Sequence, residues 1–184
     1  MEALAHKPDL TIKTLVIQGE FATSDDPNEV LTTVLGSCVC TCLHDPVAKV
    51  GGLNHFLLGD QPTGHAESTK YGVYCMELLI NDLLKRGARR ERLLAKLAGG
   101  AQMLTGASDI GMRNADFAMR FLEREGIDLI GKNLGGDRAR RIRFWPASGR
   151  TQVMLVQNTN TAEIEALNVK KPTPVQDLGD VELF

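Results

Sequence analysis

The sequence of 184 residues lacks several features that mark particular classes of protein. It has no dense run of lysine or arginine and a formal net charge of -2, so nucleic acid is not an expected partner. No segment is apolar over the length of a membrane span, and charged residues interrupt residues 1–14, where a secretory signal needs an apolar stretch. We therefore expect a cytoplasmic protein without membrane insertion.

Cysteine is scarce, and its spacing does not resemble a disulfide framework. The four cysteines are Cys38, Cys40, Cys42 and Cys75. Three of them cluster within five residues, whereas small secreted domains spread an even set along the chain. In the cytoplasm they should remain thiols, so at least one is available for chemistry.

The length and the 43% hydrophobic content are ordinary for one globular domain, and no internal repeat is present. We expect a single domain over residues 1–157. Residues 158–184 are polar, contain Pro172 and Pro174 and show no sustained period, which predicts a poorly ordered tail.

Hydrophobic periodicity predicts an α+β fold, with mixed or antiparallel sheet layers flanked by two main helices. Strands come in runs, interrupted by the two helical segments. The expected strands are 10–18, 29–34, 38–44, 49–58, 93–97, 127–134, 140–145 and 151–157; the helices are 73–84 and 114–125; the loops include 21–28, 59–70 and 99–111.

A hairpin in the first half carries the most informative geometry. A tight turn centred on Pro46 and Val47 pairs residues whose numbers sum to 93, which sets Cys38 opposite His55 on one sheet face. With a loop one residue longer, Phe56 would face the cysteine instead. The prediction therefore depends on the register.

A thiol beside an imidazole suits amide hydrolysis. A thiolate stabilised by imidazolium can attack the amide, and the same histidine can then protonate the leaving ammonia and activate water against the thioester. Backbone amides of residues 36–38 could form an oxyanion hole. Three hydroxyl side chains could orient the histidine: Thr32, Thr33 and Ser37.

The surrounding residues resemble a known family. The run Val-Leu-Gly-Ser-Cys-Val at 34–39, the pair Asp45-Pro46 and Gly-Gly-Leu-Asn-His at 51–55 are similar to the signature of CheD, a family of chemoreceptor glutamine deamidases. The similarity spans roughly residues 10–157 and includes the segments 71–73, 76–81, 99–101, 110–114 and 134–136.

The resemblance implies a CheD-like cysteine hydrolase fold with Cys38 as nucleophile, His55 as base and Thr32 as the third member of a triad, with Thr33 as the alternative. It implies deamidation of glutamines on the cytoplasmic helices of chemotaxis receptors, without a cofactor, and methyl-ester hydrolysis as a side activity. It also implies a CheC-type phosphatase as a partner in some organisms.

Other interpretations of the same residues stay open. A buried cysteine is usually a small hydrophobe. Cys38, Cys40, Cys42 and His44 share a strand face, but residues ~7 Å apart cannot converge on one metal ion without a strong bend, so no metal site is expected.

Two further functional classes also stay open. The chain could be a non-catalytic adaptor that binds receptors or a phosphatase, or a thiol redox sensor. A run of arginines could attract an acidic receptor surface or cover a solvated strand face, and its members are Arg138, Arg140, Arg141 and Arg143.

Overall fold

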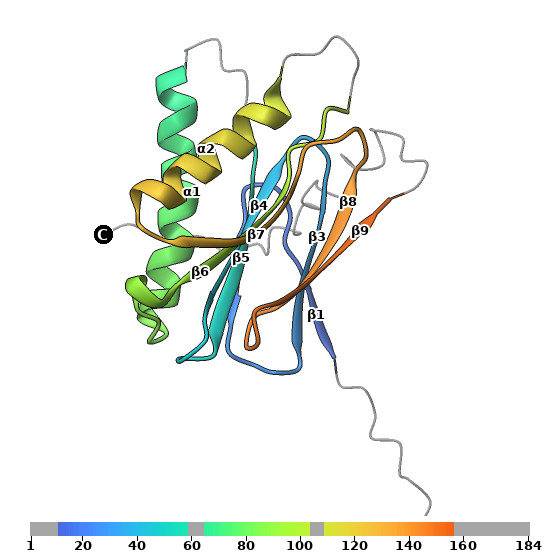
Figure 1. The fold of residues 1–184 in the computed structure, drawn as a ribbon. Helices are drawn as coiled ribbons and strands as arrows, with labels where there is room; N and C mark the ends of the chain where they lie inside the picture. The colour runs from blue at the N-terminus through green and yellow to red at the C-terminus, as the bar shows by residue number, and fades with distance from the viewer. Residues whose placement is uncertain (1–10, 59–64, 104–108, 157–184) are drawn as a thin grey trace, which may run out of the picture.

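The computed structural model describes residues 11–58, 65–103 and 109–156, which form three layers (Figure 1). Two long helices cover one face of a five-stranded sheet, and a four-stranded sheet covers its other face. The helices are α1 (His65–Lys85) and α2 (Ile110–Arg124), with a short 3-10 turn at Arg90–Arg92. The strands are β1 (Ile12–Leu15), β2 (Phe21–Ser24), β3 (Glu29–Leu35), β4 (Val39–Asp45), β5 (Val50–Phe56), β6 (Leu94–Gly99), β7 (Asp128–Leu134), β8 (Arg140–Trp145) and β9 (Arg150–Leu155).

Both sheets are mixed, which confirms the predicted α+β class. The five-stranded sheet has the order β2-β5-β4-β6-β7, and only β6 and β7 in it run parallel. The four-stranded sheet has the order β1-β3-β8-β9, with β1 parallel to β3. Within the described residues, no helix is both long and apolar enough to cross a membrane.

Strand β4 is buried on both faces because it lies in the middle layer. Its Val39 and Leu43 pack among the helices, whereas Cys40 and Cys42 point between the two sheets. Alternation of side chains along a strand produces this division. Each fully buried aliphatic side chain contributes roughly 1.5–3 kcal/mol, so both faces of β4 stabilise the three-layer stack.

Helix α1 is longer than the predicted 73–84, and the prediction of a loop over 59–70 is wrong from residue 65 onward. Its core stripe follows the helical period, with Met76, Ile80 and Leu83 fully buried. The helix stops at Gly87, which adopts a φ of 92°, and the next amide returns to the Leu83 carbonyl at 3.0 Å. The first turns of α1 were not predicted because residues 65–70 are mostly polar.

The predicted loop over 21–28 is also partly wrong, since Phe21–Ser24 forms β2 and pairs with β5. The turn-forming composition applies only to the residues after Ser24. The predicted strand over 10–18 is shorter than expected because the chain turns at Gln18 and Gly19. The tail predicted over 158–184 lies outside the described residues.

The β4–β5 hairpin has a different register from the predicted one. The structure sets Cys40, not Cys38, opposite His55. The shift is two residues, so side-chain alternation keeps Cys38 on the same face as Cys40 and His55. Cys38 lies just before β4 and belongs to the cluster between the sheets.

The register differs because the turn is wider than a two-residue loop. Asp45 pairs with Val50, and residues 46–49 form the connection. The Lys49 amide donates to the Asp45 carbonyl at 2.8 Å, and Lys49 adopts a φ of 54°, a conformation that non-glycine residues rarely adopt.

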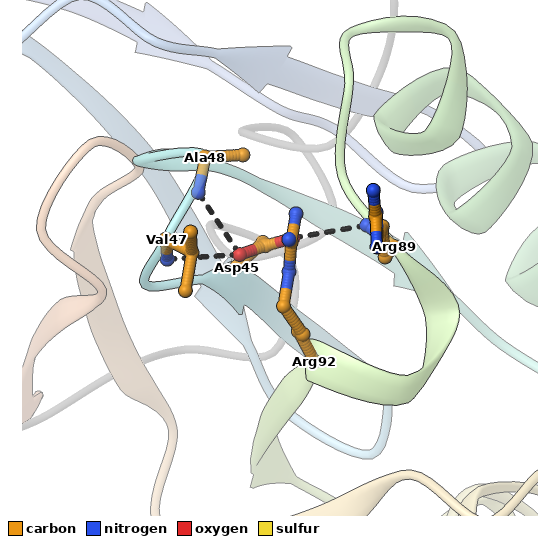
Figure 2. A network of polar contacts seen from close by, with 5 residues as sticks. All are labelled: Asp45, Val47, Ala48, Arg89 and Arg92. Carbon is orange, nitrogen blue, oxygen red and sulfur yellow. Dashed lines mark hydrogen bonds and ion pairs between the residues drawn. The ribbon is translucent and has the colours of Figure 1, made fainter.

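The Asp45 carboxylate organises this turn (Figure 2). One oxygen accepts from the Val47 and Ala48 amides at 2.9 and 3.0 Å. The other accepts from the Arg89 amide at 2.9 Å and from Arg92 Nε and Nη2 at 2.9 and 2.7 Å. This buried carboxylate thus ties the hairpin loop to the segment that follows α1.

Candidate active site

Cys38 sits in a segment whose carbonyls are all fixed by neighbouring elements. The Gly100 amide donates to the Cys38 carbonyl at 2.7 Å, and the Ala101 amide donates to the Gly36 carbonyl at 2.9 Å. Asn114 Nδ2 of α2 donates to the Ser37 carbonyl at 2.9 Å. Three separate contacts therefore hold the backbone around the sulfur.

The close approach of residues 99 and 100 depends on glycine. A Cβ at Gly99 would lie 2.1 Å from the Cys38 carbonyl oxygen, and Gly99 adopts a φ of 115°. A side chain at this position would push the Cys38 backbone away. Close backbone packing therefore explains why Gly99 and Gly100 lack side chains.

His55 of β5 projects between the sheets and contacts β3. Its Nδ1 lies 2.8 Å from Thr33 Oγ1, and the residue is fully buried. Among the described residues, its Nε2 makes no hydrogen bond of ordinary length and angle, although the Val16 backbone lies close enough to the ring to affect its pKa. A buried polar atom without a partner costs roughly 1–3 kcal/mol, and such atoms are found at reactive sites. When Nδ1 carries the proton and donates to Thr33, Nε2 is the basic nitrogen.

Thr33, not Thr32, lies against the histidine. Leu31 and Leu35 of β3 belong to the cluster between the sheets, so alternation turns Thr33 to that side as well. Thr32 projects from the opposite face of β3. The resemblance selected the residue six positions before the cysteine, and the structure instead brings its neighbour to the imidazole.

Cys38 and His55 share the layer between the sheets on a diagonal rather than a direct pair. Diagonal neighbours have Cα atoms ~7–8 Å apart and Cβ atoms somewhat closer, a separation that an imidazole can span. Cys40 pairs directly with His55 but is fully buried, whereas Cys38 retains 6% of its accessible surface. Of these two cysteines, only Cys38 is accessible to an incoming group.

Burial sets the protonation of both groups. It raises the pKa of Cys38 to about 12, opposed by the residue's own backbone amide. It lowers the pKa of His55 to about 4, opposed by the Val16 carbonyl. At neutral pH the pair is thus a thiol and a neutral imidazole, which differs from the preformed thiolate and imidazolium expected from the sequence.

Helix α1 contributes the side chain of Tyr71 near the cysteine. A Cβ on Gly19 would lie 3.5 Å from the Tyr71 hydroxyl. Burial, a hydrogen bond with Cys75 and the nearby sulfurs of Cys75 and Cys38 raise the pKa of Tyr71 to about 12. Tyr71 therefore remains a neutral phenol beside the thiol. Tyr71 belongs to the family-like pattern, but nothing in that pattern indicated its position near Cys38.

Among the side chains that the structure describes, the other cysteines and histidines do not form a second centre. A hydrogen bond with Cys40 and burial raise the pKa of Cys42 well above its ordinary value, so it is an inert thiol. His44 Nδ1 lies 2.8 Å from the Pro146 carbonyl and links β4 to the β8–β9 hairpin. Within the described ranges, no group of three histidine, cysteine or acidic side chains is arranged to hold a metal ion.

The arginine run is not a uniform surface. Arg140 is buried, and its Nη1 donates to the backbone and side-chain oxygens of Asn133, both at 2.6 Å. It anchors the connection between β7 and β8. Arg141 is exposed on the same strand, so only part of the run is accessible to a partner.

The family model for CheD, described as CheD chemotactic sensory transduction, matches residues 57–155. A protein of Caulobacter vibrioides (strain NA1000 / CB15N) is 51% identical over 179 residues, which cover 96% of each chain. This chain belongs to the CheD family. The printed name of that relative is "Probable chemoreceptor glutamine deamidase CheD".

Further CheD relatives show the same extent of similarity. A protein of Acidiphilium cryptum with the same printed name is 50% identical over 188 residues, covering 98% of this chain and 97% of its own. Among solved structures, a DUF152 protein of Neisseria meningitidis is similar with a TM-score of 0.44 and 11% identity, over 68% of this chain and 63% of its own. The predicted membership of the CheD family is confirmed, and it extends over Cys38 and His55, which precede the family-model match.

Proposed function

We propose that this protein is a chemoreceptor glutamine deamidase that acts through Cys38, His55 and Thr33. The observation that carries the proposal is the Nε2 of a buried, neutral His55, which lacks a hydrogen-bond partner among the described residues and lies in the same layer as Cys38, a cysteine more exposed than Cys40. The printed names of the CheD relatives supply the substrate class. The reaction would take place in the cytoplasm, on the helices of the receptors.

In the first half-reaction, the Cys38 sulfur attacks the side-chain carbonyl carbon of a receptor glutamine while His55 Nε2 takes the thiol proton. Since both groups start neutral, the proton moves as the carbon–sulfur bond forms. The oxyanion would be held by backbone amides near the fixed 36–38 segment. His55 then returns the proton to the nitrogen, and ammonia leaves a thioester on Cys38.

In the second half-reaction, His55 takes a proton from water, and the resulting hydroxide attacks the thioester carbon. The carbon–sulfur bond breaks, Cys38 regains its proton, and the receptor side chain leaves as glutamate. Thr33 acts through His55, because its hydroxyl holds Nδ1 and so fixes the orientation of the ring. A receptor methyl ester could react in the same way, with methanol as the leaving group.

The test is mass mapping of glutamine-to-glutamate conversion in a receptor fragment incubated with the protein. We expect conversion by the wild type and by Cys40→Ala, a matched variant that removes the thiol directly opposite His55. Cys38→Ala should convert none. Equal conversion by wild type and Cys38→Ala would contradict the enzyme proposal and leave the adaptor alternative.

A CheC-type phosphatase partner stays a prediction from the resemblance. The redox-sensor alternative also stays open to a direct measurement. It requires a reversible loss of free thiols on mild oxidation, and an unchanged thiol count would remove it.

A further inference from the structure

The side chain of Gln18 contacts the sulfur of Cys38. Gln18 Oε1 lies 3.4 Å from Cys38 Sγ, and the thiol donates to it. Gln18 is exposed, whereas Cys38 is buried. An exposed side chain in contact with a buried sulfur stands on the solvent side of that sulfur, where an incoming substrate would also arrive.

The turn that carries Gln18 is fastened to His55. The Glu20 amide donates to the Ile17 carbonyl at 3.0 Å, and Gly19 adopts a φ of 84°, as the third position of a type II turn requires. The Gly19 amide donates to the His55 carbonyl at 2.7 Å, and the His55 amide donates to the Glu20 carbonyl at 3.0 Å. Both backbone polar groups of the histidine therefore hold this turn.

The group in front of the thiol is itself a glutamine carboxamide. It has the same chemical structure as the substrate side chain of the proposed reaction, and the mechanism above does not use it. We propose that Gln18 occupies the position of the substrate carboxamide in the resting protein, and that the receptor glutamine displaces it. This inference rests on the proposed function, since it needs Cys38 as the nucleophile.

The contact explains how the resting thiol stays unreactive. Gln18 accepts a hydrogen bond from the thiol and covers the exposed side of Cys38, so small electrophiles reach the sulfur less easily. When a substrate glutamine enters, its carboxamide takes the position of the Gln18 carboxamide. The new contact with the sulfur offsets the free energy lost when the Gln18 contact breaks. Displacement thus couples exposure of the sulfur to substrate arrival.

The first test is the rate at which iodoacetamide alkylates Cys38 in the folded protein, measured by peptide mass spectrometry without a receptor. We expect Gln18→Ala and Gln18→Met to raise this rate several-fold, because both lack the carboxamide. Gln18→Glu should lower it, since a carboxylate beside the sulfur disfavours the thiolate. Gln152→Ala, which removes an exposed glutamine from β9, is the matched control and should leave the rate unchanged.

An equal alkylation rate at Cys38 in the wild type and all Gln18 variants would overturn the inference. This result does not depend on receptor deamidation, so it is distinguishable from a failure of the proposed function. The rates at Cys40 and Cys42 serve as internal standards for general loosening of the fold. A rise at all three cysteines would mean that the variants merely open the structure, and it would also overturn the inference.

Steady-state kinetics on the receptor fragment give a second readout. Because Gln18 competes with the substrate, Gln18→Ala should lower KM while kcat changes less than KM. A raised KM would show that Gln18 helps to bind substrate and would contradict displacement. Slow conversion of Gln18 itself to glutamate in the wild type, absent in Cys38→Ala, would support its place at the substrate position.

Discussion

The two ends of the β4–β5 hairpin differ in how completely their buried polar groups are hydrogen-bonded. At the turn, five donors from two segments satisfy the fully buried Asp45 carboxylate. At the other end, the buried His55 has one ring nitrogen fixed and the other without a partner among the described residues. Satisfied polar groups stabilise a fold, whereas a basic ring nitrogen without a partner is available to exchange a proton.

The pKa shifts follow the same contrast. Burial alone would raise the pKa of Asp45, but Arg92 and the Ala48, Arg89 and Val47 amides lower it to about 2. At His55, burial dominates and lowers the pKa to about 4. The turn therefore contains a carboxylate that stays charged. The His55 end of the hairpin instead contains neutral groups that can exchange a proton.

The largest expected effect is a loss of activity when His55 is replaced. His55→Asn should lower the deamidation rate by roughly 10²–10⁴-fold, because it removes the general base. Its free energy of unfolding should change little, since the substitution also removes an unsatisfied buried nitrogen. Receptor-fragment assays and urea denaturation measure the two quantities. Wild-type activity in this variant would mean that the two ends do not differ in chemical role.

At the turn, we expect the reverse pattern. Asp45→Ala leaves Arg92 and two loop amides without their acceptor, and breaking a buried ion pair from one side costs roughly 3–5 kcal/mol. The loss should appear in urea denaturation, with the activity per folded molecule preserved. A variant that keeps full stability would show that the carboxylate does not organise the loop.

A smaller effect should separate two adjacent threonines. Thr33→Val removes the hydroxyl that fixes His55 Nδ1, and the loss of ~1.4 kcal/mol of positioning would lower kcat about tenfold. Thr32→Val is the matched control on the outer face of β3 and should leave kcat unchanged. If Thr32→Val lowers kcat instead, the triad follows the family spacing and not the contact in this structure.

A fourth comparison concerns the pH dependence of stability. Asp45 has a folded pKa of about 2, below its ordinary 3.8, so its contribution is complete above the ordinary value and is lost as the pH falls through about 2. The His55 contribution is complete above pH 6.5 and is lost as the pH falls through about 4, because the unfolded imidazole takes up its proton first. Urea denaturation against pH should lose the upper slope in His55→Asn and the lower slope in Asp45→Asn. Unchanged slopes in both variants would contradict these shifts.

Sequence periodicity predicted the parts of the fold that depend on a buried stripe or an alternating strand. The α1 stripe follows directly from apolar spacing. The alternation rule also kept Cys38 and His55 on one face when the register moved by two. An error of one residue would have separated them.

Sequence reasoning failed where side chains determine the backbone. The Asp45 carboxylate stabilises a four-residue loop that composition cannot distinguish from a tighter turn. Its ligand Arg92 comes from beyond α1, and such a distant partner leaves no local pattern. Likewise, nothing in the sequence placed Gln18 over Cys38, although Gln-Gly after an apolar strand is a turn signal that could have indicated the reversal.

The most direct test of the account is to trap the thioester. The wild-type protein is mixed with a receptor fragment, quenched in acid within the first turnover, digested and examined by mass spectrometry. The account predicts a receptor peptide attached through its glutamine carbonyl to Cys38. A peptide attached to Cys40, the residue directly opposite His55, or no covalent species despite continued deamidation would contradict it.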